Sequence, residues 1–144
     1  MKEVEILLVE DNKGDILLTQ EALQNWDIKH NINALGDGEQ AIHFLRAAEH
    51  QRAGELPDLV ILDINLPKLD GKQVLKFIRS EAHLQHLPVV IFSSSINDSD
   101  VTEANELKAN LYLQKPAELQ HYFDAVQAIQ QFWTSHTKQN IHAQ

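Results

Sequence analysis

The sequence predicts an α/β fold built on a doubly wound, five-stranded parallel sheet with five helices. Short apolar runs alternate along the chain with segments whose apolar residues recur at helical spacing. The runs are apolar at successive positions, which is typical of parallel strands that are buried between two layers of helices. For such a sheet of five strands we expect the strand order 2-1-3-4-5.

The first half of the chain supplies two strand–helix units. Residues 4–9 form a short run rich in leucine and β-branched residues, which predicts a buried strand. Apolar residues at helical spacing predict a helix at residues 14–26. Residues 28–35 predict a weaker strand, and after the glycine-containing turn at residues 36–38 the same spacing predicts a helix at residues 39–51.

The second half begins with two further units. Residues 59–62 are wholly apolar and predict a central strand, and after a loop with proline and glycine a helix is predicted at residues 72–80. Residues 89–92 predict the fourth strand. Asn97 is a suitable cap for a helix that ends near Lys108.

The last unit combines a strand at residues 111–114 with a long helix at residues 118–133. From Ser135 onward the residues are polar, and we expect them to fray. We therefore assign residues 1–134 to one folded domain and residues 135–144 to a polar C-terminal tail.

Composition and charge narrow the class of protein. The 144 residues fit one domain, and the absence of cysteine excludes disulfides and thiolate metal sites. A net charge of −9 leaves no basic surface for phosphate backbones, so we expect no nucleic-acid partner. No apolar segment approaches the ~20 residues that span a bilayer, so we expect a cytoplasmic protein without membrane contact.

Polar side chains follow four of the five predicted strands. Glu10 and Asp11 follow the first strand, Asp63 the third, Ser93 the fourth and Lys115 the fifth. Because the carboxyl ends of parallel strands meet at one edge of the sheet, we expect these side chains to converge. Carboxylates packed this closely repel one another unless a cation or shifted pKa values compensate. Oxygen ligands without histidine or cysteine favour Mg²⁺.

The same pocket suits a phosphoryl group. A lysine and a hydroxyl beside a metal can bind a doubly charged anion, and a carboxylate below it can act as the nucleophile. Acidic residues after strands also occur as ordinary turn formers and helix caps. One functional group at each of four strand ends is a much more specific pattern than any of these residues alone.

Over residues 4–133 the chain resembles the response-regulator receiver family of two-component signalling. The motifs that carry the resemblance are LLVEDN (7–12), PDLVILDINLPKLDG (57–71), PVVIFSSS (88–95) and LYLQKP (111–116). The resemblance implies a flavodoxin-like receiver fold, phosphorylation by a histidine kinase and Mg²⁺ as cofactor. It also implies a phosphoacceptor signalling protein rather than an enzyme, because a receiver catalyses only its own phosphorylation and dephosphorylation.

The resemblance assigns roles around the metal. Asp63 matches the phosphoacceptor and is also a metal ligand. Asp11 matches a direct metal ligand, and Glu10 matches a ligand that acts through water. Asn65 is expected to offer its backbone carbonyl to the metal. Glu10 stands where aspartate is commoner, but it keeps the carboxylate.

Further roles concern the phosphoryl group and the switch. Lys115 is expected to contact the phosphoryl oxygens, and its bond to Pro116 is expected to be cis. Ser93 matches the switch hydroxyl, which is more commonly threonine, and Tyr112 matches the aromatic residue that reorients with it. Phosphorylation is then expected to switch the surface of the fourth helix, last strand and last helix for dimer or partner binding.

Within the family, the chain is most similar to single-domain receivers that partner cyanobacterial phytochrome histidine kinases. The similarity lies in DINLPKLDGKQVL (63–75), in the long last helix and in its Phe132-Trp133 ending.

Two apolar surfaces are candidates for partner contacts. Ile16, Leu17 and Leu18 span about 200° of a helix, so at least one should be exposed, near Asp11. This is either an ordinary exposed residue or a docking patch for the kinase. Phe132 and Trp133 point about 100° apart, so one core can hardly bury both. Either the last helix forms a homodimer, or these residues cap the end of the domain.

Two other functions fit this topology less well. A flavodoxin-like electron carrier needs a phosphate-binding loop after the first strand, where Glu10 and Asp11 would repel the flavin phosphate. A phosphohydrolase with an aspartate nucleophile carries that residue on its first strand, whereas Asp63 follows the third.

In receivers the residues two positions after the phosphoacceptor and the switch hydroxyl tune hydrolysis. Here they are Asn65 and Ser95. Asn65 can reach a water but Ser95 is short and neutral, so we expect phospho-Asp63 to outlast that of receivers with an acid or amide at both positions.

Overall fold

The computed structural model describes residues 3–49, 56–95 and 97–143, and its centre is a five-stranded parallel sheet with the order β2-β1-β3-β4-β5. The predicted fold class and strand order are thus confirmed. The strands are β1 (Val4–Val9), β2 (His30–Leu35), β3 (Leu59–Leu62), β4 (Val89–Ser93) and β5 (Leu111–Gln114). The helices are α1 (Lys13–Leu23), α2 (Gly38–Glu49), α3 (Gly71–Ser80), α4 (Asp98–Glu106) and α5 (Leu119–Ala143).

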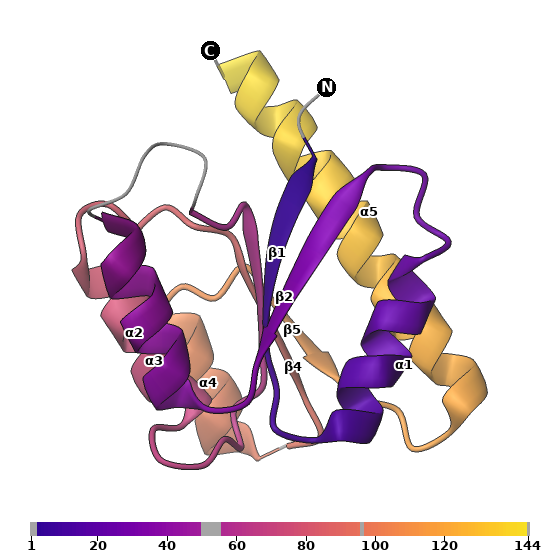
Figure 1. The fold of residues 1–144 in the computed structure, drawn as a ribbon, viewed down its shortest axis with the longest axis horizontal. Coiled ribbons are helices and arrows are strands. Elements are labelled where there is room, and N and C mark those ends of the chain that lie inside the picture. The colour runs from indigo at the N-terminus through magenta and orange to yellow at the C-terminus, as the bar shows by residue number, and fades with distance from the viewer. Residues whose placement is uncertain (1–2, 50–55, 96, 144) are drawn as a thin grey trace.

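Helices cover the sheet on both faces, with α2, α3 and α4 on one side and α1 and α5 on the other (Figure 1). Successive residues of β1 alternate between two apolar cores. Leu7 and Val9 pack into the core under α2, α3 and α4, whereas Ile6 and Leu8 pack into the core under α1 and α5. Because side chains of a strand point alternately to its two faces, an uninterrupted apolar run is what a sheet between two layers requires.

Side-chain caps fix where the helices next to the sheet edge begin. The Asn12 side chain accepts a hydrogen bond from the backbone N–H of Asp15 at the start of α1. Asp70 and Gln73 form a reciprocal capping box at the start of α3. Asn97 caps α4, as predicted, by accepting from the N–H of Ser99. Each cap satisfies an N–H that has no partner inside the helix, so α1, α3 and α4 begin at defined positions beside the strand ends.

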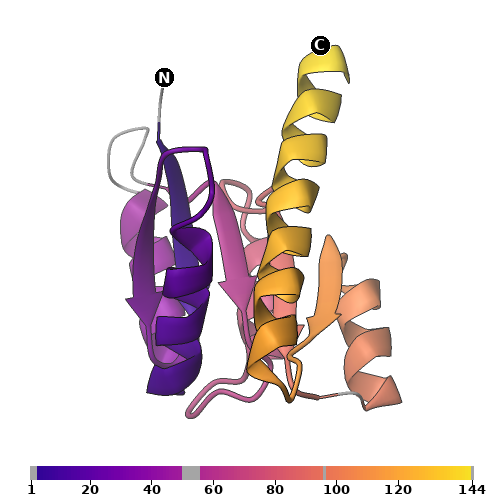
Figure 2. The same ribbon diagram turned by 90° about the vertical axis from the view of Figure 1, so that its right-hand side faces the viewer.

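The last helix is longer than the sequence predicts. It was expected to end at Trp133, but α5 continues to Ala143 and extends past the end of the sheet (Figure 2). No glycine or proline follows Pro116, so nothing in this segment interrupts helical hydrogen bonding, although its residues are polar.

Among the described residues, no helix combines the length and apolar character needed to cross a membrane.

Smaller differences occur at other element ends. Strand β2 begins at His30 rather than at residue 28, because its pairing with β1 begins between Val4 and His30. The predicted end of the second helix, residues 50–51, lies outside the described residues.

Candidate functional site

Three carboxylates converge at the carboxyl end of the sheet. Strands β1 and β3 are neighbours, with Val9 paired to Leu62, so Glu10 and Asp63 follow directly at adjacent strand ends. One oxygen each from Glu10, Asp11 and Asp63 lies within 4.8 Å of the others. Glu10 and Asp63 are buried, whereas Asp11 is exposed at the rim. The predicted cluster of carboxylates is therefore present in the structure.

A glycine brings α3 close to this cluster. A β-carbon added at Gly71 would lie only 2.1 Å from the carbonyl oxygen of Asp63. The backbone N–H of Gly71 also donates to the carbonyl of Ile64 at 2.8 Å. Any larger residue at position 71 would push the loop after β3 outward, so Gly71 helps to fix the position of Asp63.

Lys115 joins the cluster from the end of β5. Its ammonium group donates to Asp63 Oδ2 at 2.8 Å, to Asp15 Oδ2 at 2.9 Å and to Glu10 Oε1. The side chain of Lys115 is only 9% exposed, and its backbone N–H donates to the carbonyl of Ser93 at 2.8 Å. A buried ammonium group of this kind is stable because each of its three N–H groups has a carboxyl oxygen as acceptor.

Burial and hydrogen bonding shift the pKa values of these groups in different directions. Burial, with a smaller effect from Asp63, raises the pKa of Glu10 to about 8. Burial also acts to raise the pKa of Asp63, but hydrogen bonds with Glu10, Lys115 and Ser93 outweigh it and lower the pKa. Burial acts to lower the pKa of Lys115, but its carboxylate partners raise it. The site therefore holds Asp63 as a carboxylate beside a lysine cation.

The donor set fits a divalent cation that prefers oxygen ligands. Burial and the neighbouring Asp63 both raise the pKa of Glu10. A bound cation would reduce the repulsion between these two carboxylates and favour the ionised form of Glu10. Asn65 lies in the loop after β3, exposed to solvent, and its N–H donates to Asp63 Oδ1 at 3.2 Å. The carboxylates of Glu10, Asp11 and Asp63 are close enough together to hold one cation.

Ser93 and Tyr112 meet at the loop between β4 and α4. Ser93 is fully buried at the end of β4, and its hydroxyl accepts from the N–H of Ser95 at 3.3 Å. The half-buried Tyr112 donates its hydroxyl to the carbonyl of Ser95 at 3.1 Å. Both predicted switch residues therefore contact one loop, which is a necessary condition for them to move together.

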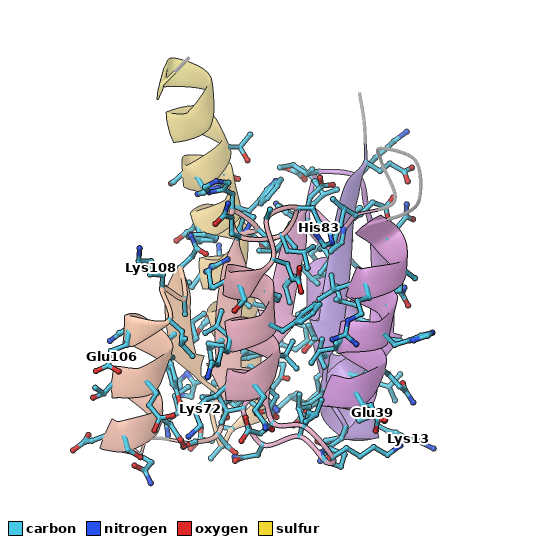
Figure 3. The ribbon with its side chains drawn as sticks, turned by 90° about the vertical axis from the view of Figure 1, so that its left-hand side faces the viewer. Lys13, Glu39, Lys72, His83, Glu106 and Lys108 are labelled. Atoms are coloured by element: carbon cyan, nitrogen blue, oxygen red, sulfur yellow. The ribbon has the colours of Figure 1, made fainter. Side chains whose placement is uncertain are left out.

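The structure adds two features that the sequence reasoning missed. The first is Asp15, which reaches Lys115 from the first turn of α1. The second is a chain of contacts in which the Ser95 hydroxyl donates to Asp100 at 2.6 Å and Lys72 pairs with Asp100 at 2.8 Å. Figure 3 shows Lys72 at the lower end of α3, on the side that faces α4. Asp15 could not be singled out from the sequence, because an acidic residue in the first turn of a helix is common.

One local prediction was wrong. The bond between Lys115 and Pro116 was expected to be cis, but the described part of the chain contains no cis peptide bond. Lys115 reaches Asp63 with the trans bond, so the cis form is not needed for this contact.

The two predicted apolar surfaces differ in exposure. Leu17 is 64% exposed and Ile16 is half-buried, so the expectation of an exposed apolar residue in this triplet is confirmed. Phe132 and Trp133 are both half-buried and both pack against the core under α1 and α5. Each therefore retains exposed apolar surface near the C-terminal end of the domain.

Comparison with known proteins decides the family. Residues 6–127 match the model of the response regulator receiver domain. The chain belongs to the response-regulator receiver family. Accepting a phosphoryl group from a histidine kinase is the function of this family, so the chain is a signalling protein with a receiver domain rather than an enzyme of the classical kind. Receiver domains bind a divalent metal, and the carboxylate cluster agrees with this property.

Several receivers of phytochrome pathways are similar to this chain. The response regulator Rcp1 of Synechocystis sp. is 42% identical over 128 residues, covering 89% of this chain and 87% of Rcp1. The structure of the phosphorylated cyanobacterial phytochrome response regulator RcpA is 42% identical with a TM-score of 0.85, covering 94% of this chain and 96% of RcpA. The Mn²⁺-bound form of Rcp1 has a TM-score of 0.83 at 41% identity, covering 90% and 94%.

Proposed function

We propose that this receiver accepts a phosphoryl group on Asp63, in a reaction that depends on Mg²⁺. The observation that carries the proposal is the environment of Asp63. This buried carboxylate pairs with Lys115 and lies with Glu10 and Asp11 in a cluster that is compact enough to bind one metal ion. Glu10 is also buried and also contacts Lys115, but its pKa is raised, whereas that of Asp63 is lowered. A lowered pKa keeps Asp63 ionised and available as a nucleophile.

The residues of the site divide the work of phosphoryl transfer. An oxygen of Asp63 attacks phosphorus while the bond from phosphorus to the donor histidine breaks, and the electron pair of that bond stays on the histidine nitrogen. Lys115 and the Ser93 hydroxyl are placed to donate to the phosphoryl oxygens. When bound, Mg²⁺ supplies positive charge that offsets the repulsion between the anionic phosphoryl group and the carboxylates. Glu10, Asp11, Asp63 and the Asn65 carbonyl would hold it.

The same site gives the protein its limited catalytic ability. We propose that it promotes its own phosphorylation from small donors such as acetyl phosphate, and its own dephosphorylation by water. Both reactions use the same charges around Asp63, because the group that is transferred is the same. The protein then signals through the surface of α4, β5 and α5, with Ser93 and Tyr112 as the switch residues.

A phytochrome-type histidine kinase is the proposed phosphodonor. The support is the similarity to Rcp1 and to the phytochrome response regulator RcpA along nearly the whole chain. Leu17 and Ile16 lie one to two helical turns from Asp11 and offer an apolar docking patch for the kinase beside the site. We assign the receiver domain to residues 1–134 and residues 135–144 to a polar C-terminal tail, of which residues 135–143 continue α5 as a helix. We also propose that the protein forms a homodimer through α5, with Phe132 and Trp133 in the interface.

The test of the proposed function is phosphorylation of the Asp63→Asn variant. With acetyl phosphate and Mg²⁺ the wild-type protein should gain the mass of one phosphoryl group, and EDTA should prevent it. Asp63→Asn should gain none, because an amide is not a nucleophile here. The matched control is Asp27→Asn. Asp27 is exposed and lies beyond the C-terminal end of α1, whereas the site lies at the N-terminal end, so this variant should behave as wild type. Full labelling of Asp63→Asn would refute the assignment.

A further inference from the structure

The number of acceptors around Lys115 matches the number of its protons. An ammonium group has three N–H donors, and the structure gives each one a carboxylate, on Glu10, Asp15 and Asp63. The lysine side chain is long and flexible, so its ammonium group keeps a fixed position only when hydrogen-bond acceptors hold it. Three carboxyl acceptors, which come from the end of β1, the first turn of α1 and the end of β3, hold the Lys115 ammonium group in the resting protein.

Two of these three acceptors have other tasks in the proposed function. Asp63 becomes part of the acyl phosphate, and Glu10 belongs to the cluster that would hold the metal. Asp15 is outside that cluster, because the three residues whose ligand atoms lie within 4.8 Å of one another are Glu10, Asp11 and Asp63. Asp15 therefore remains available to Lys115 when the other two carboxylates are engaged.

The backbone of Asp15 is held on both sides. Its N–H donates to the Asn12 side chain at 3.0 Å. Its carbonyl accepts from the hydroxyl of Thr19 at 2.9 Å and from that of Tyr122 at 3.3 Å. Thr19 and Tyr122 are buried, at 2% and 3% exposure, and their hydroxyls lie 3.1 Å apart. Asp15 is thus anchored to both α1 and α5, and its side chain presents a fixed acceptor to the lysine.

We propose that Asp15 is a positioning residue that holds the Lys115 ammonium group at the phosphoryl site when Glu10 and Asp63 are engaged. The inference rests on the proposed function of Asp63. Without the charge of Asp15, the Lys115 cation keeps two acceptors that face a divalent cation, and like-charge repulsion drives the ammonium group toward solvent. A lysine that is out of place cannot donate to the incoming phosphoryl oxygens, so the transfer slows.

The experiment compares wild type, Asp15→Asn and Asp15→Glu at saturating Mg²⁺, with acetyl phosphate as the donor. A small donor is chosen because Leu17, on the same helix, belongs to the proposed kinase-docking patch. Asp15→Asn should lower the rate constant of phosphorylation by about three- to tenfold, while the final extent stays at one phosphoryl group. Asp15→Glu should recover part of the rate, because it restores the charge.

A second readout reports on the lysine directly. Nitrogen-15 NMR of the Mg²⁺-loaded, unphosphorylated protein should show a protected Lys115 ammonium signal, assigned by its absence in Lys115→Met. The signal should broaden or disappear in Asp15→Asn and return in Asp15→Glu. The matched control is Glu21→Gln, which removes one negative charge from an exposed position of the same helix and should change neither the rate nor the signal.

Three results would overturn the proposal. One is a rate for Asp15→Asn equal to or above that of wild type, which would mean that Asp15 withholds Lys115 from the phosphoryl group or does nothing. Another is an unchanged Lys115 signal. The third is complete loss of labelling, because a positioning residue changes the rate and not the extent. Failure of the proposed function has a different signature, since Asp63→Asn would then still be labelled.

Discussion

Glu10 is a buried carboxyl group of the site whose pKa is raised in the folded protein. Burial, followed by the hydrogen bond with Asp63, raises its pKa to about 8. In the unfolded chain its pKa returns to the ordinary value of 4.5. The folded protein without metal therefore binds one more proton than the unfolded chain between these two pH values, and stability falls as pH rises through this window.

This difference predicts how stability depends on pH. In EDTA, the free energy of unfolding should be lower at pH 8.5 than at pH 6, because the contribution of Glu10 is lost as pH rises through about 8. Urea unfolding at the two pH values measures it. Glu10→Gln should remove most of the difference, since an amide does not titrate. Mg²⁺ should bind more tightly as pH approaches 8, because metal binding displaces the proton. A pH-independent metal affinity would contradict this account of Glu10.

Most residues of the candidate site could be predicted from the sequence because of where they stand. Glu10, Asp11, Asp63 and Lys115 each follow a strand, and parallel strands end at one edge of the sheet. Asp15 could not be separated from an ordinary acidic residue in the first turn of a helix, where the helix dipole favours it. Its contact with Lys115 depends on the side-chain geometry of two distant elements, which no local pattern contains.

The loop between β4 and α4 is linked to α3 by side chains rather than by backbone pairing. Ser95 donates to Asp100, and Asp100 pairs with Lys72, which also contacts Glu103 at 3.1 Å. The Tyr112 hydroxyl binds the carbonyl of Ser95 in the same loop. Changes at Ser95 therefore act on the position of the loop as well as on water near the phosphoryl group.

Ser95→Glu should shorten the lifetime of phospho-Asp63. A carboxylate at this position can orient the attacking water, and we expect hydrolysis up to about tenfold faster, or about 1.4 kcal/mol of barrier. The measurement is decay of labelled protein after the donor is removed. Asp100→Asn is the matched control, because it weakens the same loop contact without adding an acid near the water. An unchanged or slower decay in Ser95→Glu would contradict the prediction.

The lengths of elements were less predictable than their order. Strand β3 is wholly buried and its bounds at residues 59–62 were predicted correctly, because both faces are apolar. The polar residues after Trp133 predict fraying, but α5 continues to Ala143, because a polar segment without glycine or proline can continue a helix. The strands are defined by burial, but the helix end depends on the absence of an interrupting residue.

At the scale of the whole molecule, α5 carries apolar surface where it leaves the sheet. Phe132 and Trp133 contact the core under α1 and α5 but keep part of their rings exposed. Phe132 also stacks against His136 with the ring centres 5.5 Å apart. A second copy of the chain would cover this surface, which agrees with the proposed homodimer.

Phe132→Ala combined with Trp133→Ala should shift the protein toward monomer in sedimentation. The variant loses the aromatic area that a partner would bury, and such residues dominate the energy of interfaces. Mg²⁺ binding should be unchanged, which shows that the fold is retained. The control is Gln131→Ala, an exposed neighbour on the same helix. A wild-type protein that stays monomeric at high micromolar concentration, with or without phosphorylation, would rule the dimer out.

The proposed function of this protein depends on which residue carries the phosphoryl group. Borohydride reduces an aspartyl phosphate to homoserine, so trapping the phosphorylated protein and mapping its peptides by mass spectrometry locates the modified residue. We predict homoserine at position 63 alone, in an amount equal to the phosphoryl group bound, and none when EDTA is present during phosphorylation. Homoserine at position 11 or 15, or a phosphoryl group that borohydride does not displace, would contradict the proposal that Asp63 is the phosphoacceptor.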